Sequence, residues 1–349
     1  MKSKKQILVH LGSGFGNILM ATPMMEMLSR GGYQVDLCLQ GETPGVEKLF
    51  ENWPFVRTVS SSPETFVSNS YAYYIYGDEV QSPPIKFVNQ NKAIVLHPVW
   101  DIKKSFELYS EIEMYTNIAR AIDCNLALVK QPSCSTSDRI FEDITEKTCV
   151  LIPGGQKQMP IRKWPWYGEL AGQLEDVAVV GLPSDLDMSN RIIFPPWIRQ
   201  LSGNHLNYQG RWWRTARIFA ERQDHKICFP SHVKNYIGKL SLDDTAALIK
   251  QAGFVIGNDS GLTHLSVALG KPVFALIGPT SSRKVFPRFL SNVTVISRKY
   301  DCQPCHEKPW MKVWRENLAQ CFCPYHIRCM NDIKAEDVLI ALQEIPKLE

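Results

Sequence analysis

The stretch from Asn258 to His264 combines residue types that could bind a phosphorylated ligand. It follows one apolar run and precedes another, which predicts a strand, a turn and a short helix. The backbone N–H groups of Ser260 and Gly261 would then be open at the helix N-terminus, where anions bind. Asp259 could accept a hydrogen bond from a sugar hydroxyl, and His264 could donate one to a phosphate. Ordinary helix capping by Asp259 or Ser260 is the alternative interpretation of the same residues.

Two basic clusters could contact a charged or polar ligand. Arg162-Lys163 follows another predicted strand and its glycine loop, where adjacent cations could meet a diphosphate with Trp164 packed behind them. A solvated basic pair is the alternative. The cluster Arg211-Trp212-Trp213-Arg214 with Arg217 could form an acceptor surface, but its pattern favours an amphipathic patch.

The glycine-rich segment Gly12-Ser13-Gly14-Phe15-Gly16 follows the predicted strand at residues 7–9. Its spacing differs from the G-x-G-x-x-G of dinucleotide-binding loops, and Asp36 precedes the end of the second strand rather than following it. A nicotinamide or flavin role is therefore disfavoured. A tight strand-to-helix turn and a substrate-facing loop are the two interpretations that the residues leave open.

The cysteines are clustered near the C-terminus, with five of the ten between residues 302 and 329. Their spacing is Cys302-x2-Cys305, then Cys321-x-Cys323, then Cys329, and His306 and His326 are weaker ligand candidates. Two short-spaced pairs separated by a loop are typical of a tetrahedral four-thiolate site, which suits zinc or iron. Such a metal would be structural, because a full thiolate set leaves no open position for a substrate. Free thiols and a disulfide are the alternatives.

The elements that must position these residues form two α/β series. The first has expected strands over 7–9, 35–39, 71–76 and 93–96, with helices over 17–29 and 107–122. The second has expected strands over 149–152, 177–180, 254–257 and 272–277, with helices over 166–174, 241–252, 263–269 and 334–342. Two such series predict two facing Rossmann-like domains, with a ligand in the cleft at the carboxyl ends of the strands.

The composition is that of an ordinary folded protein. A chain of 349 residues suffices for about two domains. Its 44% hydrophobic and 21% charged residues exclude disordered and low-complexity classes. The 39 Lys and Arg residues against 35 Asp and Glu give a net charge of +4, which does not indicate a nucleic-acid partner. No apolar run approaches the ~18–20 residues of a membrane span, and no signal peptide is evident, so we expect a cytoplasmic protein.

Several motifs occur in an order that is typical of one enzyme family. They are Gly16-Asn17-Ile18-Leu19-Met20-Ala21-Thr22-Pro23, Arg162-Lys163-Trp164-Pro165, Gly238-Lys239-Leu240-Ser241-Leu242, Gly257-Asn258-Asp259-Ser260-Gly261-Leu262-Thr263-His264 and Gly278-Pro279-Thr280. On these residues the chain resembles glycosyltransferase family 9, the ADP-heptose heptosyltransferases of lipopolysaccharide assembly and their relatives. The resemblance extends over nearly the whole chain, and its most specific element is the Asp-Ser-Gly-x-x-His block.

The resemblance implies a GT-B fold whose last helix crosses back to the first domain. The implied parts are an N-terminal acceptor-side domain (1–135), a linker (136–148), a nucleotide-sugar donor domain (149–300), a cysteine-rich metal-binding segment (301–331) and a C-terminal helix (332–349). The implied activity is an inverting, metal-independent transfer of a heptose or similar sugar from an ADP-sugar to a lipopolysaccharide-core or protein hydroxyl. A lipid-linked acceptor would bring the protein to the inner-membrane face, although no amphipathic anchor is evident.

The resemblance also assigns site residues by motif position. The donor would be bound by Arg162, Lys163, Leu240, Asp259, Ser260, Gly261, Leu262 and His264, while Gly14, Gly16 and Thr22 would lie on the acceptor side. Family-like sequences end in a similar cysteine pattern, which matches Cys302, Cys305, Cys323 and Cys329 and leaves Cys321 as an alternative ligand.

One position departs from the family pattern. The family usually has an aspartate as general base where this chain has Asn17, and a carboxamide does not accept a proton at neutral pH. Either another group serves as base, or Asn17 only orients the acceptor, or the protein is slow or non-catalytic. The alternative function is therefore a non-catalytic sugar-nucleotide-binding or assembly protein on the same fold. The candidate replacement bases are His10, Asp101, Glu111 and Glu113, which the sequence leaves unranked.

Overall fold

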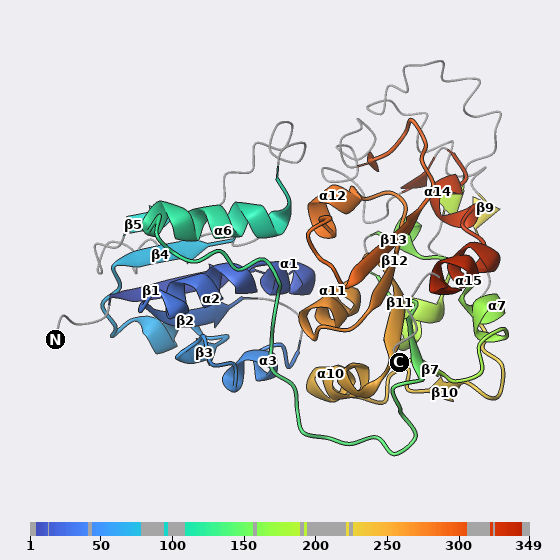
Figure 1. The fold of residues 1–349 in the computed structure, drawn as a ribbon, viewed down its shortest axis with the longest axis horizontal. Coiled ribbons are helices and arrows are strands. Elements are labelled where there is room, and N and C mark those ends of the chain that lie inside the picture. Colours follow the sequence, from blue (N-terminus) through green and yellow to red (C-terminus); the bar gives the residue numbers. More distant parts are fainter. Residues whose placement is uncertain are drawn as a thin grey trace.

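The fold consists of two α/β domains that lie side by side (Figure 1). The computed structural model describes residues 5–12, 14–40, 44–77, 94–96, 109–155, 159–188, 192–193, 221–222, 226–305, 322–323 and 325–343. Asp101, His306, Cys321 and the cluster from Arg211 to Arg217 lie outside the described residues.

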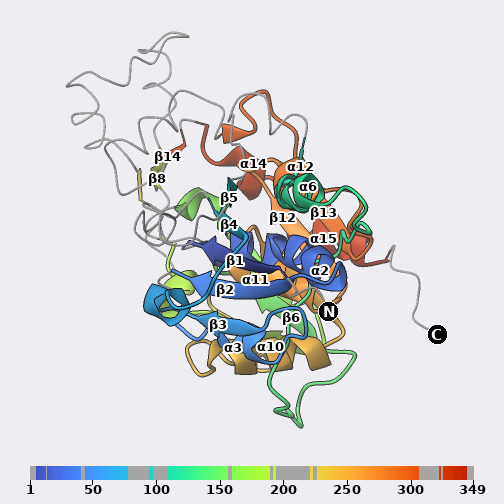
Figure 2. The same ribbon diagram turned by 90° about the vertical axis from the view of Figure 1, so that its left-hand side faces the viewer.

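The first domain is built on a five-stranded sheet in the order β3-β2-β1-β4-β5, visible from bottom to top in Figure 2. The strands are β1 (Gln6–Leu11), β2 (Gln34–Leu39), β3 (Thr58–Ser60), β4 (Tyr73–Tyr76) and β5 (Ile94–Leu96), and all neighbours are parallel. This order is that of a Rossmann-like sheet, in which the first strand is central. The apolar run of β1 is buried almost throughout because helices or loops cover both faces of a parallel sheet.

The helices of the first domain are α1 (Phe15–Met20), α2 (Thr22–Arg30), α3 (Lys48–Glu51) and α6 (Glu111–Ile122), with a short 3₁₀ turn η1 (Pro63–Phe66). The single helix expected over 17–29 is divided at Ala21. Pro23 has no N–H to donate to Leu19, whose carbonyl accepts a hydrogen bond from the Thr22 hydroxyl at 2.7 Å instead. Helix α6 begins later than expected because Ser110 and Glu113 form a capping box in front of it.

The second domain contains a six-stranded parallel sheet in the order β10-β7-β6-β11-β12-β13. Its strands are β6 (Cys149–Ile152), β7 (Val177–Val179), β10 (Lys234–Asn235), β11 (Phe254–Asn258), β12 (Val273–Ile277) and β13 (Val293–Ser297). The two edge strands have weaker apolar patterns and were not expected from the sequence. The predicted α/β class with two Rossmann-like domains is confirmed.

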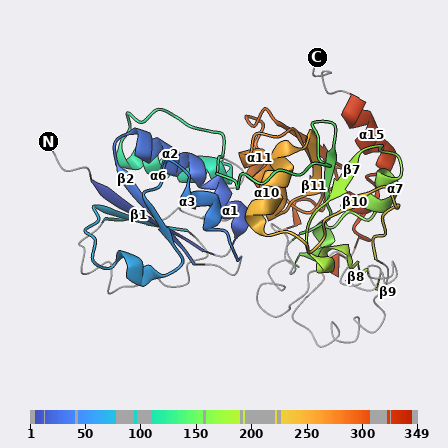
Figure 3. The same ribbon diagram turned by 90° about the horizontal axis from the view of Figure 1, so that it is seen from below.

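The helical elements of the second domain are η2 (Pro160–Arg162), α7 (Tyr167–Ala171), η3 (Pro183–Leu186), α10 (Leu242–Gln251), α11 (Gly261–Ala268) and α12 (Ser282–Val285). Helix α10 begins after Ser241, whose side chain accepts a hydrogen bond from the backbone N–H of Asp244. Helix α11 begins two residues earlier than expected, directly after Ser260. Helices α1 and α11 meet where the two domains face each other (Figure 3).

The C-terminal part adds a small sheet and two helices to the second domain. The sheet has the order β14-β8-β9, formed by Phe322–Cys323, Ile192–Ile193 and Glu221–Arg222, and α14 (Arg328–Asn331) follows it. Helix α15 (Ala335–Gln343) packs on α7 and β13, on the side of the second domain away from the first (Figures 1 and 3). The described part of the C-terminal helix therefore packs on the second domain, whereas the resemblance implied a helix that crosses back to the first domain. The buried side chains of Ala335 and Val338 explain this position, because they join the apolar core of the second domain.

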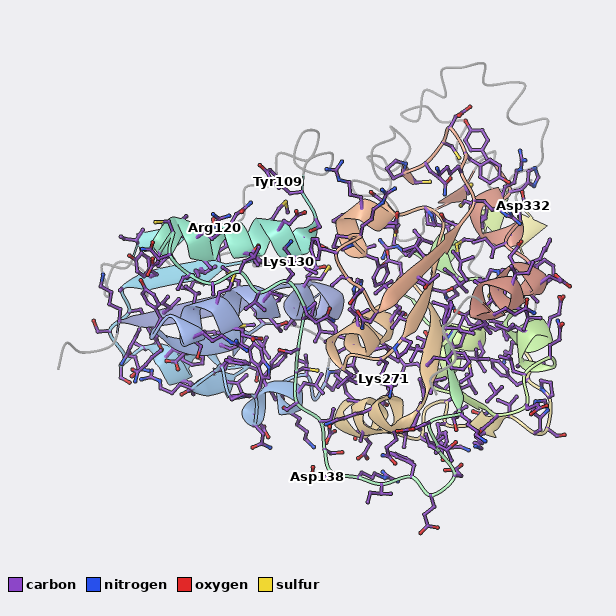
Figure 4. The ribbon with its side chains drawn as sticks, in the orientation of Figure 1. Tyr109, Arg120, Lys130, Asp138, Lys271 and Asp332 are labelled. Atoms are coloured by element: carbon purple, nitrogen blue, oxygen red, sulfur yellow. The ribbon has the colours of Figure 1, made fainter. Side chains whose placement is uncertain are left out.

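The segment that connects the domains is hydrogen-bonded to both of them. Ser133 accepts a hydrogen bond from Trp53 in the first domain, whereas Arg139 pairs with Asp244 and Gln131 donates to the carbonyl of Val267 in the second. Figure 4 labels Lys130 and Asp138 along this segment. The strands of the first large sheet all precede the predicted linker at 136–148, and those of the second all follow it. The exact domain boundaries stay predictions.

One cluster of buried apolar side chains continues from the first domain into the second, so the domains share a packed interface.

Among the described residues, no helix has the length and apolar character needed to cross a membrane.

Candidate active site

A cleft of about 1000 Å³ lies between the domains, at the carboxyl ends of β6 and β11. In open α/β sheets this is where ligands bind. The predicted site residues that line it are Gly14, Gly16, Asn17, Arg162, Leu240, Asp259, Ser260, Gly261, Leu262 and His264. The sequence motifs, which are far apart along the chain, thus meet in one cavity.

The N-terminus of α11 faces this cleft. Ser260 caps the helix, because its side chain accepts a hydrogen bond from the backbone N–H of Thr263 at 3.4 Å. Ser260, Gly261 and Leu262 all line the cavity. The Ser260 side chain accepts a hydrogen bond from only one N–H group of the first turn. Capping by Ser260 is therefore compatible with anion binding by the other N–H groups of this turn.

A buried charged cluster adjoins this helix terminus. The Asp259 carboxylate lies 3.2 Å from the Arg162 guanidinium and 3.3 Å from Nε2 of His264. Burial alone would raise the pKa of Asp259, but the charge of Arg162, and after it His264, outweighs burial and holds this pKa below its usual value. Asp259 is therefore ionised at neutral pH and fixes the orientation of both partners.

Several polar atoms of this cluster lack hydrogen bonds. Nε of Arg162 and Oγ1 of Thr280 are buried and make no hydrogen bond to the described residues, and Oδ2 of Asp259, although ion-paired with Arg162, accepts none either. A buried polar group without a partner is costly, and native proteins keep few of them. All three residues line the cleft, so a bound ligand could provide the missing partners.

Asn258 holds the loops around the cluster in place. Its Oδ1 accepts hydrogen bonds from the backbone of Trp164 at 3.2 Å and from the Tyr167 hydroxyl at 3.1 Å. Its Nδ2 donates to the carbonyls of Pro153 and Gly154. The buried indole of Trp164 also donates to the carbonyl of Ile333. This network fixes the backbone on which Arg162 is mounted.

Two predicted site residues are not among those that line the cleft. The ammonium of Lys163 is buried and donates to the carbonyls of Ser184 and Asp187, both at 2.8 Å, so it holds the η3 turn. Thr22 is also buried, and its hydroxyl accepts a hydrogen bond from the backbone of Ser133. Direct ligand binding by either residue is therefore not evident from the geometry.

Glycines let the first domain approach helix α11 of the second domain closely. A Cβ on Gly16 would lie 2.8 Å from Cδ2 of His264, and a Cβ on Gly261 would lie 2.5 Å from the Phe15 ring. Larger residues would push α1 and α11 apart. The glycine-rich segment therefore acts as a close-approach loop beside the cavity, which combines the turn and substrate-facing interpretations.

The structure distinguishes the candidate bases by position. Only Glu111, among the described members of that set, lines the cleft. Its carboxylate is 2% exposed and lies 3.5 Å from Nζ of Lys284, on the opposite domain. Burial raises the pKa of Glu111, and electrostatic interactions with Lys284 and, after it, His264 oppose that effect. Glu113 is occupied in the capping box, and Nδ1 of His10 bonds the Tyr74 hydroxyl at 2.7 Å.

Sequence reasoning gave no site role to Thr280, Lys284 and Asp185, which line the cleft. Thr280 belongs to the recognised Gly278-Pro279-Thr280 motif after β12 but was assigned no function, and Lys284 lies in no recognised motif. Asp185 follows β7 and accepts a hydrogen bond from the backbone N–H of Leu182 at 2.7 Å. Burial raises the pKa of Asp185, while the backbone bond from Leu182 and the charge of Lys163 oppose this. An acidic residue shortly after the second strand of a Rossmann-like unit is a known ribose-binding signal, which could have identified it.

The cysteine cluster lies apart from the cleft. Cys305, Cys323 and Cys329 are buried in the apolar core of the second domain, while Cys302 is partly exposed. The backbone of Cys305 bonds the carbonyl of Pro279, and a Cβ on Gly278 would lie 3.0 Å from Sγ of Cys329. Within the described ranges, no three His, Cys, Asp or Glu side chains are arranged to hold a metal. Cys321 falls outside those ranges.

Comparisons with known proteins agree with this architecture. Over 97% of both chains, the fold matches that of the ADP-heptose lipopolysaccharide heptosyltransferase II of Escherichia coli, with a TM-score of 0.62 and 17% identity. It also matches the iron-containing dodecameric glycosyltransferase TibC of enterotoxigenic Escherichia coli, with a TM-score of 0.57 and 17% identity, over 99% of this chain and 77% of TibC. The fold is thus the GT-B fold of glycosyltransferases.

The sequence comparisons point to one family within that class. Residues 216–312 match the model of glycosyltransferase family 9 (heptosyltransferase). Lipopolysaccharide heptosyltransferase 2 of Escherichia coli is 30% identical over 147 residues, which are 40% of this chain and 34% of that protein. The aligned part thus spans about a third of this curated relative. Together these findings confirm the resemblance to glycosyltransferase family 9.

Proposed function

We propose that the chain is an inverting, metal-independent glycosyltransferase that transfers a heptose or a similar sugar from an ADP-sugar donor to a hydroxyl group. The observation that carries this proposal is the buried charged cluster of Arg162, Asp259 and His264 in the interdomain cleft, in which Nε of Arg162 and the nearby Oγ1 of Thr280 lack hydrogen bonds to the described residues. They adjoin the N-terminus of α11, where a diphosphate would be favoured by the helix dipole.

The donor diphosphate would lie between Arg162, His264 and the first turn of α11. The Arg162 guanidinium, oriented by Asp259, would stabilise the negative charge that develops on the leaving diphosphate. The ring of His264 stacks on Phe286 with centroids 4.5 Å apart, so its position is also fixed. Hydrogen-bond donors that are already fixed in position need little rearrangement during the reaction.

The nucleoside would lie at the other end of the cleft. The Asp185 carboxylate is oriented by the hydrogen bond that it accepts from the backbone N–H of Leu182, and it could accept further hydrogen bonds from ribose hydroxyls. Leu182, Leu240 and Tyr236 line the same cavity and offer an apolar surface for a base.

Glu111 is the group that we propose as general base in place of the family aspartate. It would take the proton of the acceptor hydroxyl as the oxygen attacks the anomeric carbon, and the bond from that carbon to the diphosphate would break. Attack opposite the leaving group inverts the configuration. Asn17, which lines the same cavity, would orient the acceptor through its amide.

The second candidate function is sugar-nucleotide binding without turnover, and the amide at Asn17 favours it. The two functions are separated by incubating the protein with ADP-heptose and measuring ADP release. Lipopolysaccharide core lacking heptose and a serine- and threonine-rich protein would serve as acceptors. Release above the acceptor-free rate supports transfer and names the acceptor class. Donor binding with no release on either acceptor supports the non-catalytic function.

The acceptor is proposed from the relatives, whose names refer to lipopolysaccharide heptosyltransfer. A lipopolysaccharide-core acceptor would require peripheral contact with the inner-membrane face. A protein hydroxyl is the other acceptor class, and no nucleic-acid partner is proposed.

A structural zinc or iron at Cys302, Cys305, Cys323 and Cys329 is also proposed, with Cys321 as the alternative ligand. The support is the cysteine spacing and the burial of three of these thiols in one core cluster. Elemental analysis of the purified protein tests it, with Cys329→Ser and Cys124→Ser as a matched pair. We expect about one metal per chain, lost in Cys329→Ser and kept in Cys124→Ser, which removes an exposed thiol of the first domain.

A further inference from the structure

The cation Lys284 lies beside Glu111 and lines the same cleft as the proposed donor site. It belongs to α12 of the second domain, whereas Glu111 begins α6 of the first, and the two charges meet at 3.5 Å across the cleft. Both side chains line the cavity that also contains Arg162 and the α11 terminus. Glu111 is nearly inaccessible, while the Lys284 side chain is 22% exposed. Of the two side chains, that of Lys284 is therefore the more accessible to a ligand in the cleft.

Besides Lys284, two groups of the second domain interact electrostatically with Glu111 among the described residues. They are His264 of α11 and Asp259 before α11. Asp259 already shares its charge with Arg162 and His264, so it adds little net field. A diphosphate beside α11 would bring roughly two negative charges into this neighbourhood. In a cavity of low dielectric, such a charge interacts strongly with a buried carboxylate.

We propose that Lys284 is a positioning residue shared between Glu111 and the donor diphosphate, so that donor binding and protonation of Glu111 are coupled. This inference rests on the proposed function. The bound diphosphate attracts the Lys284 ammonium and weakens its pairing with Glu111. Glu111 then holds a proton more tightly, and solvent supplies that proton to the carboxylate when the donor binds. At pH values above the Glu111 pKa of the donor complex, Glu111 is ionised, and it is then a stronger base in that complex than in the free protein.

The direction of the pH dependence follows from the linkage between donor binding and proton binding. A ligand whose binding takes up protons binds more tightly as the pH falls. The association constant of the donor should therefore decrease with rising pH, by at most about tenfold per pH unit for one proton. The decrease is confined to the range between the Glu111 pKa values of the free and bound protein. The acid limb of kcat should lie at higher pH than that of kcat/KM, because these report the bound and the free protein.

The test is calorimetric titration with ADP-heptose near pH 6 in two buffers of different ionisation enthalpy. Both phosphates of this donor are esterified, so the ligand itself does not titrate there. We expect net proton uptake by the wild type. The uptake should vanish in Glu111→Gln, shrink in Lys284→Met and persist in Lys284→Arg. Glu113→Gln is the matched control, because glutamine also completes a capping box, and it should keep the wild-type uptake.

Each other outcome has a definite meaning. Donor binding without proton uptake would overturn the coupling and leave the proposed function intact. Uptake that survives in Glu111→Gln but disappears in His264→Gln would assign the proton to His264 and also overturn it. Absence of ADP-heptose binding by the folded wild type would contradict the proposed function itself, and the coupling with it.

Discussion

The two sides of the cleft are built in different ways. On the donor side, one short segment after β11 supplies Asp259, the α11 terminus and His264, and Arg162 completes a buried charged cluster. On the acceptor side, Asn17 follows a glycine loop and Glu111 begins a distant helix. The residues proposed to bind a charged leaving group thus lie mostly in one contiguous segment, and Arg162 is added to them from another loop. The proposed proton acceptor, by contrast, depends on how two remote elements meet.

The largest expected effect concerns the acceptor side. Glu111→Gln removes the only carboxylate among the candidate bases that lines the cleft within the described residues. We expect kcat to fall by about 100-fold or more, because general-base catalysis typically contributes 10²–10⁴-fold. Donor affinity should not fall, since a negative charge near the diphosphate is removed. Initial rates of ADP release and a donor titration measure the two quantities. A kcat within threefold of wild type would place the base elsewhere.

Glu111 should also define the pH dependence of the reaction. Because burial raises the pKa of Glu111, the carboxylate becomes deprotonated only above the usual range of a glutamate. The rate should therefore fall as the pH decreases through this raised pKa, and it should level off above it. A pH profile of kcat between pH 5 and 9 measures the limb. A rate that is flat down to pH 5 would contradict this assignment.

The next effect tests the donor side. Arg162→Ala removes a charged hydrogen-bond donor, for which about 1.5–3 kcal/mol is typical. We expect the affinity for ADP to fall by about 10–100-fold. Arg120→Ala is the matched control, because Arg120 is an exposed arginine on α6 of the first domain (Figure 4). Equal ADP affinities in the two variants would remove Arg162 from the donor site.

The contact between the two sides can be altered without changing a charge. In Gly261→Ala, the new Cβ would lie 2.5 Å from the Phe15 ring, so α1 and α11 must separate. Overpacking of this kind costs about 1–3 kcal/mol, and we expect Tm to fall by several degrees. Gly155→Ala is the control for stability, because, its chain neighbours aside, no atom of the described residues lies within 4 Å of its Cβ position. Thermal unfolding of both variants is the measurement, and an unchanged Tm in Gly261→Ala would argue against a tight interface.

The smallest effect is expected at the position of the family aspartate. In Asn17→Asp, kcat should change by less than about threefold, because Glu111 already supplies a carboxylate to the same cleft. The assay is again ADP release. A gain of tenfold or more would mean that residue 17 is the base position and that the wild-type chain is impaired by its amide.

Most of the fold could be predicted from the sequence. The buried strands around Ile7, Leu151 and Ile256 are continuous apolar runs, and the intervening helices have clear periodicity. The break at Ala21 was missed because Pro23 is also compatible with the first turn of a helix. The short edge strands β10 and β13 were missed because a strand with one free edge needs less apolar sequence.

Residues that line the cleft could be named from the sequence where they lie in a recognised motif, and their roles stay predictions. The segment from Asp259 to His264 combines a strand end and a helix cap, so its placement follows from local structure. Glu111 could be named but not ranked against Glu113, because their difference arises from the capping box and from Lys284 on another domain. Lys163 has the same charge as Arg162, and only the three-dimensional arrangement shows that its ammonium points to η3.

Calorimetric titration with ADP-heptose tests the central claim, that the interdomain cleft is an ADP-sugar site, most directly. Asp259→Ala is the test variant, and Asp138→Ala, an exposed change on the connecting segment (Figure 4), is its control. ADP, GDP- and UDP-sugars and NAD serve as competitors. We predict selective binding of the ADP-sugar by the wild type and by Asp138→Ala, with binding abolished in Asp259→Ala. Folded wild-type protein that binds none of these ligands, or an Asp259→Ala variant that binds as well as wild type, would contradict the account.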